Sequence, residues 1–120
     1  MRKLDLSNYE IDGLVDKKDE KDGIIDREPG RVPYDVRKSI IFIMFSPDQR
    51  LNALELLSRD KLANKINDCQ EDFVLLEQAE YEKIKNAANI VQGYSQNDIE
   101  LVKRIIDCPE VEVKPANEVE

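Results

Sequence analysis

The chain has 120 residues, of which 41% are hydrophobic and 37% are charged, and its formal net charge is -8. This length suits one domain with a modest core, and the mixture is typical of a globular protein with a solvated surface. The negative charge opposes non-specific binding to DNA and to anionic membranes. The longest apolar run, residues 40–45, is far shorter than the roughly 20 residues that a membrane-spanning helix needs.

Two features bear on the compartment. Asp5, Asn8 and Glu10 lie where the apolar core of a signal would be, so we expect no targeting signal and a cytoplasmic protein. Cys69 and Cys108 are too few for a disulfide framework, so we expect reduced thiols. A disulfide between the two is the alternative.

Residues 1–34 predict an irregular β-hairpin. Leu4 and Leu6, and then Tyr9 and Ile11, alternate with polar residues, and the change of phase between the two pairs indicates a bulge or break.

The second half of this region supplies the tip and the return strand. Residues 16–23 are charged and end in glycine, which predicts a mobile loop at the hairpin tip. Pro29-Gly30 marks a turn that interrupts the second extended segment. Residues 110–113 alternate and could add a short C-terminal strand to the hairpin.

Residues 35–108 predict a helical core of about four short helices. Asp35 is suited to cap a helix whose second half, residues 40–45, is apolar nearly all round, which indicates a central helix buried on several sides. Asn52 resembles the cap of the next helix, and the five-residue gap between Leu57 and Leu62 predicts a break near residues 58–60.

The remaining elements follow from short local signals. Residues 73–76 predict a strand or extended link, and a helix begins near Gln78 and is terminated by Gly93. Ser95 with Asp98 resembles a capping box for the last helix. That helix is expected to bury one face, formed by Ile99, Val102, Ile105 and Ile106.

The fold class that follows is α+β. An N-terminal β-hairpin, with or without a short C-terminal strand, packs beside about four short helices. We expect a single domain over residues 1–120, which comprises the hairpin region 1–34, the helical core 35–108 and a frayed tail at 114–120.

The chemistry of the side chains argues against an enzyme. The chain has no histidine, so it lacks the commonest general base and metal ligand. Two distant cysteines and four scattered glycines form no zinc site and no phosphate loop, and lysines in the charged loop disfavour calcium. We therefore expect no catalytic residue, no cofactor and no metal.

After these exclusions, binding of another molecule through the protein surface is the remaining class of function. No basic stripe or aromatic platform is present, so direct binding of nucleic acid is not expected. The leading interpretation is a non-enzymatic protein–protein interaction module, and the alternative is an acidic mimic of nucleic acid that inhibits a host nucleic-acid-binding protein. The apolar helix is first a core helix, but one side of it could meet another chain, and an isologous homodimer would be the simplest cover. The expected contacts are Ile41, Phe42, Met44 and Phe45.

The order of the stretches KLDL…VPYDVRKSI, RLNALELLSRDKLANKI, FVLLEQAEYEKIKNA and GYSQNDIELVKRII resembles small uncharacterised proteins encoded by tailed bacteriophages and prophages. The resemblance covers most of the chain and concerns overall layout. It implies a role in particle assembly or in binding a host protein, in the host cytoplasm or in the virion. It carries over no functional residue.

Overall fold

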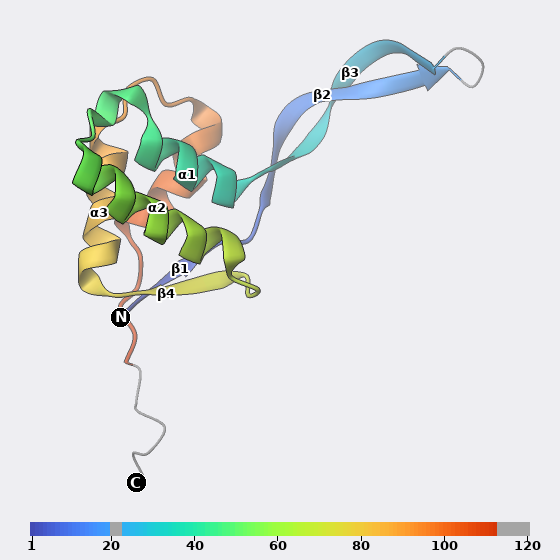
Figure 1. The fold of residues 1–120 in the computed structure, drawn as a ribbon. Coiled ribbons are helices and arrows are strands. Elements are labelled where there is room, and N and C mark those ends of the chain that lie inside the picture. Colours follow the sequence, from blue (N-terminus) through green and yellow to red (C-terminus); the bar gives the residue numbers. More distant parts are fainter. Residues whose placement is uncertain (20–22, 113–120) are drawn as a thin grey trace, which may run out of the picture.

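A computed structural model describes residues 1–19 and 23–112 (Figure 1). In chain order the elements are β1 (Arg2–Asp5), β2 (Tyr9–Asp19), β3 (Gly23–Tyr34), α1 (Val36–Phe45), η1 (Pro47–Gln49), α2 (Ala53–Asp68), β4 (Phe73–Leu76), α3 (Gln78–Ile90), η2 (Gln96–Asp98) and α4 (Ile99–Ile106). Within these two ranges two separate antiparallel sheets form, β1 with β4 and β2 with β3. The predicted α+β class is therefore confirmed.

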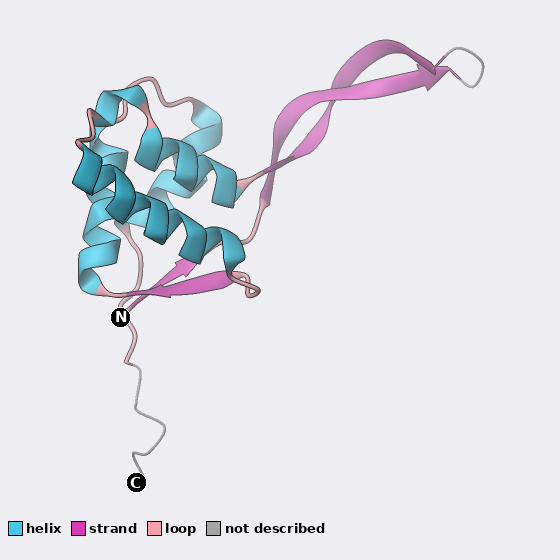
Figure 2. Cartoon of the chain, in the orientation of Figure 1, coloured by secondary structure: helices cyan, strands magenta, loops and turns pink. Residues whose placement is uncertain are grey.

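The helices and the β1–β4 sheet form one body around a shared core, and the sheet runs along one end of the helices (Figure 2). Each strand of this sheet turns alternate side chains inward, as a half-buried sheet should. Side chains with less than 2% exposure fill the centre: Leu4, Val36, Ile40, Met44, Ile66, Leu76, Ile84, Leu101 and Ile105.

Helix α1 confirms the predicted start, and it confirms the predicted burial on the side that faces the core but not at Phe42, which is 67% exposed. The Asp35 side chain accepts a hydrogen bond from the Lys38 amide, and Pro47 follows the last turn. Val36, Ile40, Ile43 and Met44 face the core.

Helix α2 begins as predicted, with the Asn52 side chain bonded to the Glu55 amide, but the predicted break at residues 58–60 is wrong. The helix is continuous because Arg59, and not a leucine, fills the inward position between Glu55 and Leu62. Leu57 instead faces solvent, with 61% of its surface exposed.

The end of α2 is held by α1. The Arg37 guanidinium donates to the carbonyl oxygens of Ile66, Cys69 and Glu71 at 2.6–2.7 Å. These carbonyls at or just beyond the helix end would otherwise lack a donor. Cys69 and Cys108 are both free thiols.

In the last helical segment the predicted capping box is confirmed, but the predicted buried face is wrong. Ser95 and Asp98 form the predicted capping box, although it caps η2, which leads into α4. Leu101 and Ile105 are buried, whereas Ile99 is 50% exposed and Ile106 39%. Apolar residues lie on two sides of the short α4. The buried side is the one that carries Leu101 and Ile105, and the Tyr81 hydroxyl donates a hydrogen bond to the Ile105 carbonyl.

The N-terminal region departs most from the prediction. β1 pairs with β4, with Leu4 opposite Val74, and it takes no part in the hairpin. The break between the two pairs of apolar residues is confirmed, since β1 ends at Asp5 and β2 begins at Tyr9.

The strands of the hairpin extend further into the predicted loop than expected, and the hairpin does not lie along the helices. We call β2 and β3 together the arm; it is twisted and projects from the helical body (Figure 1). Residues 16–19 end β2 and do not form a loop, and Pro29-Gly30 lies within β3 and is not a turn. Residues 20–22 of the predicted loop lie outside the described part.

The C-terminal extended segment joins β1 and not the arm. Glu110 forms a bridge to Arg2, and the Val111 amide donates to the Met1 carbonyl at 2.7 Å. The predicted frayed tail, residues 114–120, lies outside the described part of the chain.

A buried polar cluster joins α1, η1, α2 and α3. Arg59 is 7% exposed, and its guanidinium donates to the Met44 carbonyl at 2.9 Å and to Gln49 Oε1 at 2.8 Å. Gln49 Nε2 in turn donates to the carbonyls of Ile43 and Ala87. We call Arg59 and Gln49 the clamp.

Glu55 completes the charge balance of the clamp. Its carboxylate lies 3.0 Å from Arg59 Nε and 3.2 Å from Lys83 Nζ. The hydrogen bond from Arg59 lowers the pKa of Glu55 below its ordinary value, and Lys83 acts in the same direction.

The two neighbours Ile43 and Phe42 test the orientation of α1. Replacing Ile43, which is 3% exposed, with alanine should lower the free energy of unfolding by about 2–4 kcal/mol, because it opens a cavity in the core. Phe42→Ala, at a side chain that is 67% exposed, should cost less than about 0.5 kcal/mol. Urea unfolding measures both, and equal costs would contradict this orientation.

The clamp makes a second prediction about stability. Arg59→Met should lower the free energy of unfolding by about 3 kcal/mol, because Gln49 Oε1 and the Met44 carbonyl lose their donor and Glu55 keeps only Lys83 of its two cationic partners. Lys61→Met, an exposed position on the same helix, is the control and should change stability by no more than about 0.5 kcal/mol. A small effect at Arg59 would show that the clamp is dispensable.

Candidate protein-binding surface

The arm has two chemically different faces. Cross-strand pairing sets Tyr9 opposite Tyr34, Ile11 opposite Val32 and Gly13 opposite Gly30. Because side chains alternate between the faces of a ribbon, these pairs share one apolar face. The pairs between them, residues 10 with 33, 12 with 31 and 14 with 29, lie on the opposite face, which carries the charges.

Glycines at the middle of the apolar face let neighbouring side chains fold across it. A Cβ atom added at Gly13 would lie 2.6 Å from Val32 Cγ2, and one added at Gly30 would collide with Val15. Any larger residue at either position would push a valine away from the ribbon. The arm thus covers its apolar face with its own short side chains, and Val15 stays 38% exposed.

Two stacked tyrosines attach the arm to the helical body. The rings of Tyr9 and Tyr34 are 4.7 Å apart between centroids and nearly parallel. The Tyr9 hydroxyl donates to the Asn97 carbonyl at 2.8 Å and accepts from the Leu101 amide at 3.2 Å. The Tyr34 hydroxyl donates to the Asp98 carboxylate.

These contacts alter the acidity of both phenols. Burial raises the pKa of Tyr9, and burial together with the hydrogen bond to Asp98 raises the pKa of Tyr34 further. Both hydroxyls therefore stay protonated at neutral pH and can keep donating their hydrogen bonds.

The charged face is arranged around Arg31. Its guanidinium lies 2.8 Å from Asp12 Oδ1 and donates to the Glu10 carbonyl at 2.9 Å. The side chains remain open to solvent, at 91% exposure for Asp12 and 69% for Glu10. Exposed pairs of this kind contribute little to stability, so the two carboxylates are available to a further cation.

Two hollows lie where the arm meets the body. The first, of about 450 Å³, we call the β2 recess, and its lining is Tyr9, Glu10, Ile11, Asp12, Arg31, Gln96, Asn97, Ile99, Glu100 and Lys103. The second, of about 430 Å³, we call the α1 groove, and its lining is Tyr34, Asp35, Lys38, Ser39, Phe42, Ile43, Val91, Gln92, Gly93, Tyr94 and Asp98.

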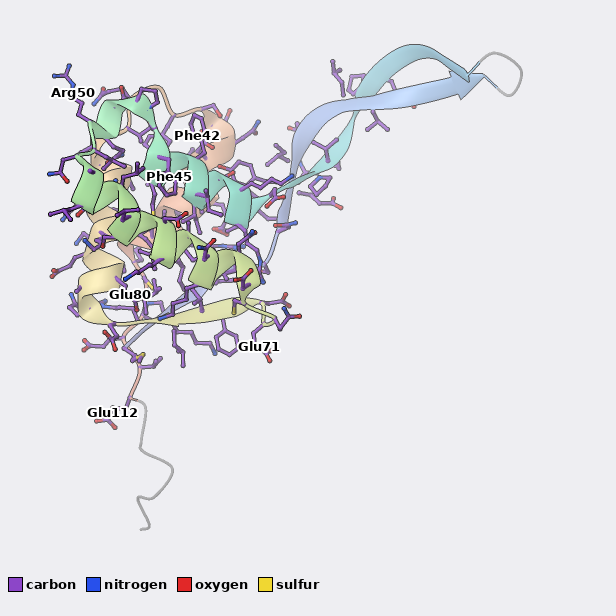
Figure 3. All side chains as sticks on the ribbon, in the orientation of Figure 1. Phe42, Phe45, Arg50, Glu71, Glu80 and Glu112 are labelled. Carbon is purple, nitrogen blue, oxygen red and sulfur yellow. The ribbon has the colours of Figure 1, made fainter. Side chains whose placement is uncertain are left out.

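The four contact residues expected on α1 are only partly available. Met44 is completely buried, so in this structure it offers no surface to a partner. Ile41 and Phe45 are half-buried against the core. Phe42 is well exposed and borders the α1 groove, and Figure 3 shows it on the outer side of α1. Of the four, Phe42 therefore offers the largest surface.

The four contact residues expected from the sequence all lie on α1, and none lies on the arm. In Figure 3 the described side chains of the arm stand apart from those of the body. The signal was present: Gly13 and Gly30 are symmetric about the tip, and Pro29 and Pro33 are four residues apart. Read as strand residues and not as turn residues, they would have indicated a twisted ribbon.

Within residues 1–19 and 23–112 other kinds of site find no support. No group of three possible metal ligands is present, and every buried polar side-chain atom has a hydrogen-bond partner. Burial raises the pKa of the Cys108 thiol, which makes it a poor nucleophile. No helix in this part is long and apolar enough to cross a membrane.

Comparison of the chain with models of protein families, with curated proteins and with solved structures gave no match.

The attachment of the arm can be tested at Tyr9. Tyr9→Phe removes the hydrogen bonds to Asn97 and Leu101, so the angle between arm and body should vary more. Spin labels at positions 14 and 64 report this as a broader distance distribution in pulsed electron resonance. Tyr94→Phe is the matched control, because its hydroxyl donates to Ala88, which is not part of the arm. Equal distributions in the two variants would show that the hydroxyl of Tyr9 does not fix the arm.

Proposed function

We propose that the protein is a non-enzymatic protein-binding domain that uses its arm as the binding element. The observation that carries the proposal is the isolation of the arm: β2 and β3 pair with each other and, among the described residues, with no other strand. A lone two-stranded hairpin is at best marginally stable in water, and a third strand or a packed helix is what normally stabilises it. A partner protein would supply that cover.

The exposed apolar residues of the arm support this role. Leu14 is 61% exposed and Val15 38%, and both lie beyond the part of the arm that Tyr9 and Tyr34 attach to the body. Apolar side chains on a projecting element favour a protein interface over a purely structural role. The chain also lacks histidine, so it has few means for catalysis.

The α1 groove is a secondary contact in this proposal. Phe42 and Tyr94 expose aromatic surface there, at 67% and 37%. With Met44 buried, α1 alone offers too little apolar area for a homodimer through that helix, so we favour a heterologous partner. Following the resemblance in sequence layout, we propose a protein of the phage particle or of its host as that partner.

The acidic mimic of nucleic acid is not favoured. It requires a face of carboxylates without neighbouring cations. In the described part of the chain acids alternate with bases: Arg31 binds Asp12, Lys65 binds Glu80, and Arg104 binds Asp5. A protein partner therefore remains the proposal.

Site-specific cross-linking in the native cells tests the proposal. A photo-reactive amino acid at position 14, on the arm, should cross-link to one discrete protein. The same amino acid at position 54 is the control, because Leu54 is 82% exposed but lies on α2, away from the arm. The purified partner should then bind the full chain, and Leu14→Ser should weaken that binding more than Leu54→Ser does. Cross-links of equal yield from both positions, or none from position 14, would contradict the proposal.

A further inference from the structure

Two prolines decide which edge of the arm can accept another strand. Pro29 and Pro33 both lie in β3, opposite Leu14 and Glu10. Proline has no amide hydrogen, so in a ladder it occupies positions whose backbone groups point away from the paired strand. Between residues 29 and 33 the outer edge of β3 therefore offers Arg31 as its only outward amide donor, and this edge is blocked for strand addition.

The same register leaves the outer edge of β2 open. Glu10, Asp12 and Leu14 are opposite Pro33, Arg31 and Pro29, so their backbone groups also point outward. Among the described residues, the amides of Asp12 and Leu14 donate to nothing outside the arm. An added strand would find the amides of Asp12 and Leu14 as donors here, as strand addition requires. The Glu10 carbonyl already accepts a hydrogen bond from the Arg31 guanidinium at 2.9 Å, so an added strand would compete with that side chain for this acceptor.

The β2 recess lies along this open edge. Its lining includes four consecutive residues of β2, Tyr9 to Asp12, but only Arg31 from β3. The opposite wall carries Ile99, which is 50% exposed, together with the charged residues Glu100 and Lys103. A chain that pairs with β2 would therefore enter a hollow of about 450 Å³ with an apolar contact at its far side.

We propose that an extended segment of the partner protein adds as a third strand to the outer edge of β2 and carries Lys or Arg at alternate positions that face Glu10 and Asp12. This deepens the proposed function and rests on it. The side chains between the basic residues face the Ile11 side of the arm and are apolar.

Charge supports this occupant over a second copy of the chain. The Glu10 and Asp12 carboxylates are largely exposed, and among the residues with described side chains the cation that pairs with both is Arg31, across the ribbon. Cations from an added strand would sit directly beside them, which stabilises a cross-strand pair. Antiparallel pairing of β2 with β2 of another copy, centred on Glu10, Ile11 or Asp12, would set two carboxylates opposite each other and is disfavoured.

Selection from a library of random 12-residue peptides, displayed against the immobilised full-length protein, tests the sequence preference. The enriched peptides should carry Lys or Arg at positions i and i+2 with apolar residues between them. Selection against Asp12→Lys should enrich an acidic residue at one of these two positions. Enrichment without a period of two, or an unchanged preference against Asp12→Lys, would overturn the proposal.

A synthetic peptide from the selected pool then locates the added strand. In the isotope-labelled full chain, the amides of Asp12 and Leu14 should become protected from hydrogen exchange when the peptide binds, whereas the amide of Arg31 should not. Protection of Arg31, or of amides that line the α1 groove in place of these two, would overturn the proposal.

Two matched proline variants separate the edges. Leu14→Pro removes an outward amide from β2 and should weaken peptide binding by about tenfold, the effect of one lost backbone hydrogen bond and a blocked register. Pro29→Ala restores an amide to the β3 edge and should change the affinity by less than about twofold. Equal losses in the two variants, or no loss in Leu14→Pro, would contradict addition at β2.

The outcomes for strand addition and for the proposed function are distinct. A partner that cross-links from position 14 and binds Leu14→Pro with unchanged affinity would leave the arm as the binding element and overturn strand addition. The absence of any cross-link from position 14 would overturn both.

Discussion

The buried guanidinium of Arg59 sits where three helical segments meet, and the geometry of the body depends on it. It donates to the carbonyl of Met44 in the last turn of α1, while its partner Gln49 bonds the carbonyls of Ile43 and Ala87. Carbonyls at helix ends need donors, and a cation of this kind is stable in a core only when its hydrogen bonds are satisfied. Because β3 ends at Tyr34 and α1 begins at Val36, whatever fixes α1 also fixes the root of the arm.

The molecule thus combines two parts of different stability. The body buries a continuous core and holds its helix ends with side chains such as Arg37 and Gln49. In its described part the arm has two strands, apolar residues beyond Tyr9 and Tyr34 that cover each other, and an attachment to the body through these two tyrosines. Local stability in a protein follows the density of buried contacts, so the arm belongs to the least stable part. An element of this kind can adapt to a partner while the body keeps its shape.

Local chemistry made much of the fold predictable. Asp35, Asn52 and the pair Ser95 with Asp98 cap their segments as their side chains require, because a cap depends only on residues within one turn. The strand at residues 73–76 and the α+β class follow from short patterns of the same kind.

The predictions that were wrong concern contacts between residues that are distant in sequence. Arg59 could not be assigned to the core before its acceptors were known, and so the gap in the leucine pattern of α2 looked like a break. The pairing of β1 with β4 joins residues about 70 positions apart, and no local signal specifies such a partner. Among the expected contacts, Met44 and Phe42 belong to one apolar run, and only tertiary packing decides which of them is exposed.

The prolines of β3 have a consequence for assembly size. A ribbon with two open edges can add strands on both sides, and each new strand offers another edge, so growth into a fibre has no natural end. With Pro29 and Pro33 on one side, the arm can be extended in one direction only. An arm that paired with another copy through β2 would turn its proline-bearing β3 edge outward. Pairing between copies of the chain should therefore end at two arms, and high concentrations of the chain should not by themselves nucleate polymers.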